Sequence, residues 1–146
     1  MTVLELAKCW AEPPHVLLVE DDEVQTAAMT EALSIYGCAV ESTNTVRQAL
    51  EKILCQFFDL VFVDLTLPDG SGVEIIKAVR DRAPNTPTLV MTGPCDIGAI
   101  AEALRCGAVT VLLKPFDFLE LKRALGLFKV RAFSRPVPDE CLTARA

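Results

Sequence analysis

Four short apolar runs in the sequence each end at a polar side chain of a different chemical type. The first run leads into three acidic residues, the second into a lone aspartate, the third into a threonine and the fourth into a lysine. These polar residues are Glu20-Asp21-Asp22, Asp64, Thr92 and Lys114. Carboxylates, a hydroxyl and an ammonium group together suit a phosphoryl group and a divalent cation. If the four runs lie side by side, the sequence predicts a pocket for both.

The four apolar runs are typical of buried strands in a parallel sheet that helices cover on both faces. They are Val16–Val19, Leu60–Val63, Thr88–Met91 and Val111–Leu113. Helical patterns alternate with the runs, which indicates βαβ units with right-handed crossovers. In an open parallel sheet, ligand sites lie just outside the carboxyl ends of the strands. The polar residues stand at these ends.

The same patterning sets the bounds of each predicted element. Strands are expected at 15–20, 39–43, 59–63, 87–91 and 109–113, and helices at 23–36, 45–56, 72–83, 96–106 and 117–130. The strand at 39–43 is the least apolar and alternates, which predicts an edge strand. Residues 15–130 therefore form one predicted domain, between an N-terminal extension, 1–14, and a C-terminal tail or start of a linker, 131–146.

Helix starts and faces are also marked in the sequence. Four N-cap residues are each followed three positions later by a side chain that can reach back: Asp22, Thr45, Ser71 and Asp117. The fourth helix has apolar residues at one-face spacing: Ile97, Ile100, Ala101 and Leu104. The fifth helix shows the same spacing: Phe118, Leu121, Leu125 and Phe128.

Composition limits the classes of function. A net charge of −6 over 146 residues argues against direct nucleic-acid binding by this segment. No apolar stretch approaches the ~20 residues that span a bilayer, so no membrane association is expected. The N-terminal residues lack the layout of a secretion signal, and the six cysteines form no C-x-x-C motif. Reduced thiols and a cytoplasmic location are therefore predicted.

Asp64 and Lys114 carry the strongest individual signals. Asp64 ends the most hydrophobic central run, and a carboxylate can attack phosphorus to form an acyl phosphate. The alternative is a solvated strand-end aspartate or a loop cap, and the position alone weighs the two about equally. Lys114 directly follows a buried run, so its charge needs a counter-charge or a route to water. A lysine that simply extends into solvent is its plain alternative.

The acidic run and the threonine are weaker signals. Adjacent carboxylates repel unless a cation holds them, and Mg²⁺ takes one or two carboxylates plus phosphate oxygens. In the alternative, Asp22 caps the first helix while Glu20 and Asp21 are merely exposed. Thr92 could donate a hydrogen bond to a phosphoryl oxygen, but threonine is common in strands.

The order of these residue types, each after its own strand, resembles the receiver domain of two-component response regulators. The resemblance covers roughly residues 14–130. It implies a flavodoxin-like α/β fold, which is a doubly wound, five-stranded parallel sheet of strand order 2-1-3-4-5 with five helices. It also implies a signalling phosphoacceptor that catalyses only its own phosphotransfer and autodephosphorylation and turns over no external metabolite.

The resemblance assigns a role to each residue of the expected Mg²⁺ site. Asp64 would accept a phosphoryl group from a histidine kinase or a phosphotransfer protein and would also contact the metal. Asp21 would be the main direct ligand, with Glu20 acting mostly through water. The main-chain carbonyl of Thr66 would complete the coordination.

The resemblance also implies roles for the residues at the ends of the last two strands. Thr92 would move toward the phosphoryl group and Lys114 would pair with it. The peptide bond from Lys114 to Pro115 would typically be cis. One position departs from the family pattern, because Val111 stands where many members carry an aromatic switch three residues before the lysine.

Without that aromatic, the signal is expected to leave through the loop and helix at 93–106. The face formed by the helix at 96–106, the strand at 109–113 and the helix at 117–130 is the hypothesised output surface and homodimer contact. The motif around Asp64 favours, weakly, a link to transcription control through an output domain or effector protein. The chain either acts alone through protein contacts or is the receiver part of a longer regulator.

Two other classes of function compete. A phosphatase of the haloacid-dehalogenase type also uses a strand-end aspartate with Mg²⁺, but it needs a second aspartate two positions on, where this chain has Thr66. A receiver-like interaction module that never gains a phosphate is the other alternative. All the acceptor-site residues are present, which argues against it.

Overall fold

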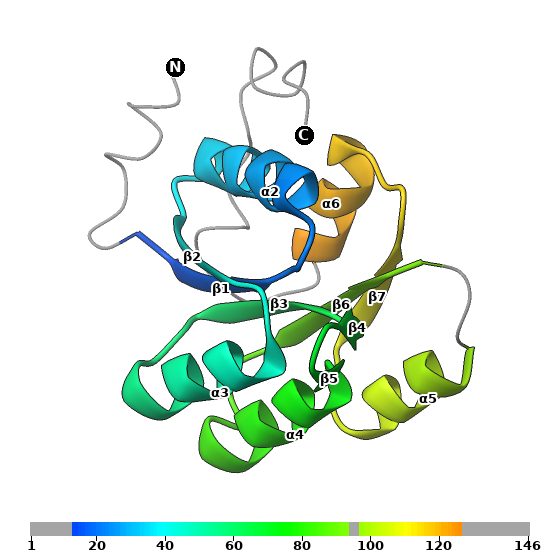
Figure 1. Cartoon of the computed structure of the whole chain (residues 1–146). Coiled ribbons are helices and arrows are strands. Elements are labelled where there is room, and N and C mark those ends of the chain that lie inside the picture. The colour runs from blue at the N-terminus through cyan, green and yellow to red at the C-terminus, as the bar shows by residue number, and fades with distance from the viewer. Residues whose placement is uncertain (1–12, 94–96, 127–146) are drawn as a thin grey trace.

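The computed structural model describes residues 13–93 and 97–126 of the chain, and its centre is one parallel sheet (Figure 1). Its strands are β1 (His15–Val19), β2 (Ala39–Thr43), β3 (Leu60–Asp64), β6 (Thr88–Thr92) and β7 (Thr110–Leu113). The order β2-β1-β3-β6-β7 is the predicted 2-1-3-4-5 when the five strands are counted along the chain. The edge position predicted for residues 39–43 is confirmed.

Five helices cover the two faces of this sheet. They are α2 (Glu23–Ile35), α3 (Val46–Cys55), α4 (Val73–Arg82), α5 (Ile97–Arg105) and α6 (Phe118–Leu125). Figure 1 shows α2 and α6 on one face and α3, α4 and α5 on the other. Every predicted element is present with bounds that differ by at most one residue, except that the last helix ends at Leu125 and residues 127–130 of its prediction lie outside the described part. The predicted fold class is confirmed.

The sheet is covered on both faces because its central strands are apolar on both faces. In β1 and β3, Leu18 and Phe62 pack toward α2 and α6, whereas Leu17 and Val61 pack toward α3 and α4. All four side chains are at most 1% exposed. Burial on this scale fixes the strand register, and with it the positions of the strand ends.

Three of the four predicted helix caps are confirmed. The side chains of Asp22, Thr45 and Asp117 each accept a hydrogen bond from the main-chain N–H three residues later. The prediction for Ser71 was wrong, because this residue belongs to a short hairpin of β4 (Thr66–Leu67) and β5 (Gly70–Ser71). Helix α4 therefore begins one residue later, after Gly72, which has no side chain to form a cap bond.

The predicted apolar face of the fourth helix was partly wrong. Ile97 is 80% exposed and Leu104 is 46% exposed, while the fully buried residue of α5 is Ala103. The predicted Ile100 is partly buried and packs against the same core cluster as Ala103. In α6 the predicted Phe118, Leu121 and Leu125 are buried. Phe128 lies outside the described residues.

Two sequence-based expectations about the chain's environment can be compared with the described residues. None of the described helices has both the length and the apolar character needed to cross a membrane. Among the described residues, the thiols of Cys38, Cys55 and Cys106 are free.

Gly72 packs directly against the backbone of Asp64, and we expect Gly72→Ala to be strongly destabilising. A Cβ atom at this position would lie 2.3 Å from the Asp64 carbonyl oxygen and 2.5 Å from Val63 Cγ1. Backbone must therefore move, at a cost of about 3 kcal/mol or more of unfolding free energy. Chemical denaturation would measure the loss. Gly126→Ala is the control, since its nearest new contact would be at 3.3 Å, and an equal loss in both variants would contradict the steric account.

Candidate functional site

The strand register brings the predicted polar residues together at the carboxyl-terminal edge of the sheet, where the strands end. Val19, which precedes Glu20, pairs with Val63, which precedes Asp64. Asp64 in turn pairs with Met91, next to Thr92. Thr92 pairs with Leu113, the residue before Lys114. The side chains that were widely separated in sequence therefore stand at neighbouring carboxyl ends, as predicted.

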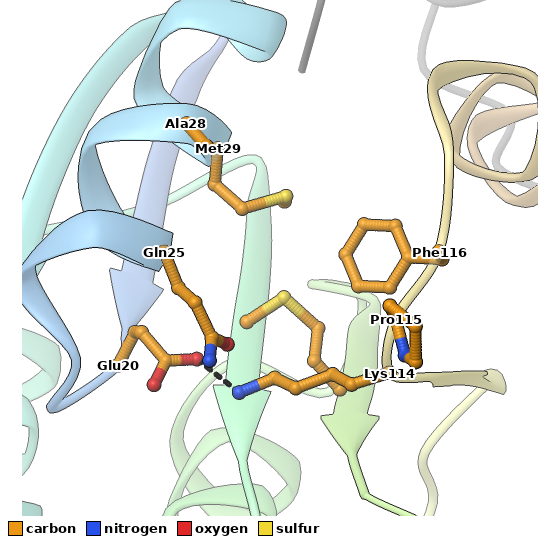
Figure 2. Close-up of a pocket in the computed structure, with 8 residues that line it drawn as sticks. Glu20, Gln25, Ala28, Met29, Lys114, Pro115 and Phe116 are labelled. Atoms are coloured by element: carbon orange, nitrogen blue, oxygen red, sulfur yellow. Dashed lines mark hydrogen bonds and ion pairs between the residues drawn. The ribbon is translucent and has the colours of Figure 1, made fainter.

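Lys114 forms the central ionic contact of this edge. Its Nζ donates to Glu20 Oε2 at 2.5 Å and to Asp64 Oδ2 at 2.8 Å, and Figure 2 shows the first of these pairs. The exposed fractions are 18% for the lysine side chain and 2% and 9% for the two carboxylates. The counter-charge expected for this lysine is therefore present. The bond from Lys114 to Pro115 is cis, as the resemblance implied.

Burial and charge shift the ionisation of this pair. Burial raises the pKa of Glu20, against the hydrogen bonds from Lys114 and from the main-chain N–H of Asp22. Burial by itself would lower the pKa of Lys114, but the hydrogen bonds from its ammonium to Asp64 and Glu20 outweigh this and raise it. The lysine is therefore charged at neutral pH, and further positive charge at the site would favour the ionised form of Glu20.

An acidic cluster lies at the same place. One carboxylate oxygen from each of Glu20, Asp21 and Asp64 lies within 4.8 Å of the others, and Asp21 is exposed to solvent. Three carboxylates thus face a single ammonium group. An all-oxygen cluster with excess negative charge and access to water fits a hard divalent cation such as Mg²⁺.

The remaining predicted residues flank Asp64. The main-chain N–H of Thr66 donates to Asp64 Oδ1 at 3.0 Å, so the second oxygen of this carboxylate is also oriented. Thr92 is buried at the end of β6, and its carbonyl accepts a hydrogen bond from the main-chain N–H of Lys114 at 2.8 Å. All the predicted site residues therefore lie at one edge of the sheet.

The model of the response regulator receiver domain family matches residues 16–126 of this chain. The chain belongs to this family. A phosphatase of the haloacid-dehalogenase type is not favoured. The receiver domain is a signalling domain of two-component systems, and it fills nearly all of the described part of the chain.

Relatives of this receiver domain include transcriptional regulators. It is 33% identical over 130 residues to the transcriptional regulatory protein ZraR of Klebsiella oxytoca, covering 88% of this chain and 29% of that protein. The chain thus spans less than a third of this relative's length.

Solved structures show the same architecture. A CheY-like receiver domain protein from Methanospirillum hungatei has a TM-score of 0.74 and 26% identity, covering 78% of this chain and 91% of that one. The receiver domain of the sensor histidine kinase PA1611 from Pseudomonas aeruginosa has a TM-score of 0.70 and 26% identity, covering 79% and 96%. That structure holds a magnesium ion in its active-site cleft.

One residue beside the receiver site, Asp69, was not predicted from the sequence. Asp69, in the loop after Asp64, accepts hydrogen bonds from the main-chain N–H groups of Val46 and Arg47. The sequence Pro68-Asp69-Gly70 is typical of a turn, but nothing in it identifies partners 23 and 22 positions earlier in the chain.

Val111 stands at the position where many members of the family carry an aromatic switch residue. Its side chain is half-buried and packs on the cluster that includes Val90 and Ala103, between β6, β7 and α5. No ring is available there to turn inward. Pro94 and Cys95, in the loop that was expected to move instead, lie outside the described residues.

Proposed function

We propose that this receiver domain accepts a phosphoryl group on Asp64 and changes its protein contacts in response. The observation that carries the proposal is the setting of Asp64. Its carboxylate is nearly buried and pairs with the Lys114 ammonium at 2.8 Å. It also lies within 4.8 Å of two further carboxylates that could share a metal.

The transfer needs a phosphohistidine from another protein. An oxygen of Asp64 forms a bond to phosphorus while the phosphorus–nitrogen bond breaks, and the electron pair returns to the imidazole ring. The product is an acyl phosphate. Lys114 provides positive charge to the phosphoryl oxygens, and Thr92 is placed to donate a hydroxyl hydrogen bond. Positioning and charge stabilisation suffice for such an in-line transfer.

Mg²⁺ is the cofactor that this cluster would hold. Asp21 and Asp64 would contact it directly, Glu20 would act through water, and the main-chain carbonyl of Thr66 would complete the protein ligands. When bound, the ion would supply charge neutralisation at the phosphoryl oxygens. The magnesium ion in the cleft of the related PA1611 receiver structure supports this assignment.

The phosphodonor is a histidine kinase or a phosphotransfer protein. The chain's single histidine, His15, is the first residue of β1, whereas Asp64 is the last residue of β3. His15 therefore lies at the opposite end of the strands and cannot supply the phosphoryl group. A cavity of about 420 Å³ opens beside the site between α2 and the residues after β7. Figure 2 shows Met29 and Phe116 facing one another across it. With exposed Val24 on the first turn of α2, this apolar surface suits a partner's helix.

The output surface is proposed on the face of α5, β7 and α6. Four apolar side chains are exposed there: Ile97, Leu104, Leu113 and Leu119. Such a surface suits a homodimer or an effector protein. A beryllofluoride complex, which mimics the acyl phosphate, should shift the amide resonances of residues 97–126 more than those of 46–55. The reverse pattern would contradict this output surface.

The proposal also covers the process that the receiver domain controls, its location and its bounds in the chain. Because relatives such as ZraR are transcriptional regulatory proteins, control of transcription through an output domain or effector is proposed. The proposed location is the cytoplasm, with no direct nucleic-acid contact from this segment. The receiver domain is assigned to 15–130, with an N-terminal extension at 1–14 and a tail or linker at 131–146. Of these flanks, only residues 13 and 14 are described.

Labelling with acetyl phosphate tests the proposed function. With Mg²⁺ present, the intact mass should rise by one phosphoryl group as acetate leaves with the electron pair of the broken bond. Removing divalent ions with a chelator should suppress the product. Absence of labelling under conditions that label a known receiver domain would support the alternative of a phosphorylation-independent interaction module.

A further inference from the structure

A carboxylate joins the loop after Asp64 to the start of α3. Asp69 lies between β4 and β5, and its Oδ1 accepts from Val46 N at 2.7 Å while its Oδ2 accepts from Arg47 N at 3.0 Å. These are the first two residues of α3. Their N–H groups have no acceptor within the helix, so the distant carboxylate satisfies two donors at once.

The charge of Asp69 suits this role. Its hydrogen bonds from Val46 and then Arg47 lower the pKa of the carboxyl group. The carboxylate is also favoured at the positive end of the α3 helix dipole. Asp69 is therefore ionised at neutral pH with both oxygens engaged, although the residue itself is exposed.

The tethered loop carries groups that the proposed function uses. Thr66 N donates to the acceptor carboxylate at 3.0 Å, and the Thr66 carbonyl is a proposed metal ligand. The base of the loop is closed by Gly72 N, which donates to Leu65 O at 3.0 Å. Its tip, Pro68 to Gly70, is exposed. The Asp69 contacts therefore hold the end of the loop that lacks core packing.

We propose that Asp69 is a positioning residue for metal binding and phosphoryl transfer at Asp64, acting by holding the Thr66 segment against α3. The inference rests on the proposed function. It adds a residue outside the acidic cluster and makes the N-terminus of α3 part of the support of the site. Asp69 itself touches neither the acceptor carboxylate nor the proposed metal ligands in the described contacts.

Helix α3 offers a matched control for this role. Thr45 is its own N-cap, with Oγ1 accepting from Gln48 N at 3.1 Å. Loss of either cap should weaken the start of the same helix by about 1 kcal/mol. Only the Asp69 contact reaches the loop after Asp64, so a role in helix capping alone would give Thr45→Ala and Asp69→Ala the same effects.

The test uses the full chain and compares Asp69→Ala, Asp69→Asn and Thr45→Ala with the wild type. Mg²⁺ affinity is measured by calorimetric titration with MgCl₂, and the initial rate of labelling is measured with acetyl phosphate. Asp69→Ala should lower both by about tenfold, the lower end of the effect of losing a direct partner of a metal ligand, because Asp69 acts through the loop that carries Thr66. Asp69→Asn keeps one acceptor oxygen and should lose less. Thr45→Ala should keep wild-type values of both.

Wild-type Mg²⁺ affinity and labelling rate in Asp69→Ala would overturn the inference, as would equal losses in Asp69→Ala and Thr45→Ala. If Asp69→Ala does not fold, the isosteric Asp69→Asn decides, and wild-type values in it would also overturn the inference. Failure of the proposed function is distinct, because the wild-type chain itself would then neither bind Mg²⁺ nor become labelled.

Discussion

Asp64→Asn is expected to abolish phosphoryl labelling and to leave the fold intact. The carboxamide has nearly the same shape but lacks the anionic oxygen that attacks phosphorus. Its oxygen can still accept from Thr66 N, as Oδ1 does now at 3.0 Å. The lost attraction to Lys114 is offset by relief of repulsion from Glu20 and Asp21. Intact mass after acetyl phosphate treatment and the thermal unfolding midpoint measure the two effects.

The control for this substitution is Asp59→Asn. Asp59 is also a carboxylate that accepts a main-chain hydrogen bond, but its Oδ2 accepts from His15 N, at the amino-terminal end of β1 and away from the site. Its replacement should therefore leave labelling at the wild-type rate. Wild-type labelling of Asp64→Asn, or loss of labelling in Asp59→Asn, would contradict the assignment of the acceptor.

Lys114→Gln is expected to reduce stability in the absence of metal. The substitution leaves the carboxylates of Glu20 and Asp64 nearly buried without their shared cation. Breaking a buried ion pair costs about 3–5 kcal/mol of unfolding free energy. We expect a loss of about 2–3 kcal/mol, below this range, since Glu20 can take up a proton instead. Chemical denaturation at neutral pH measures the loss.

The loss of unfolding free energy in Lys114→Gln should depend on pH and on added metal. The folded-state pKa of Glu20 is already raised, and without the lysine it rises further, so the destabilisation should grow as the pH rises above the unfolded value of about 4.3. Added Mg²⁺ should restore part of the stability.

Lys77→Gln is the control, because Lys77 pairs with Glu102 at 3.7 Å on the surface, where a pair contributes about 1 kcal/mol or less. Equal losses would contradict the account.

The sequence was most informative where periodicity and geometry leave few choices. Central strands buried on both faces have to lie side by side, and the carboxyl ends of parallel strands share one edge. The grouping of Asp21, Asp64, Thr92 and Lys114 followed from these rules, and the strand order followed from the resemblance of their sequence order to receiver domains. The caps at Asp22 and Thr45 followed from local hydrogen bonding, which needs no knowledge of distant segments.

Predictions failed where tertiary contacts decide the local structure. Ser71 pairs with Thr66 in a hairpin, and its Oγ accepts from Val73 N at 3.2 Å instead of from the predicted Glu74 N. This arrangement depends on the hairpin, which no local pattern predicts. The exposed Ile97 fits the apolar spacing of its helix, but α5 meets the sheet through Ala103. The partners of Asp69 lie more than 20 positions away along the chain, and no local pattern marks them.

The central claim is that Asp64, and no other residue, receives the phosphoryl group. Borohydride reduction of the chain labelled with acetyl phosphate and Mg²⁺ converts an aspartyl phosphate to homoserine, which peptide mass spectrometry can locate. The account predicts homoserine at position 64 alone, and none after chelation of Mg²⁺. Homoserine at position 21, 22 or 59 with Asp64 unmodified, or a stable phosphoryl group on His15, would contradict it.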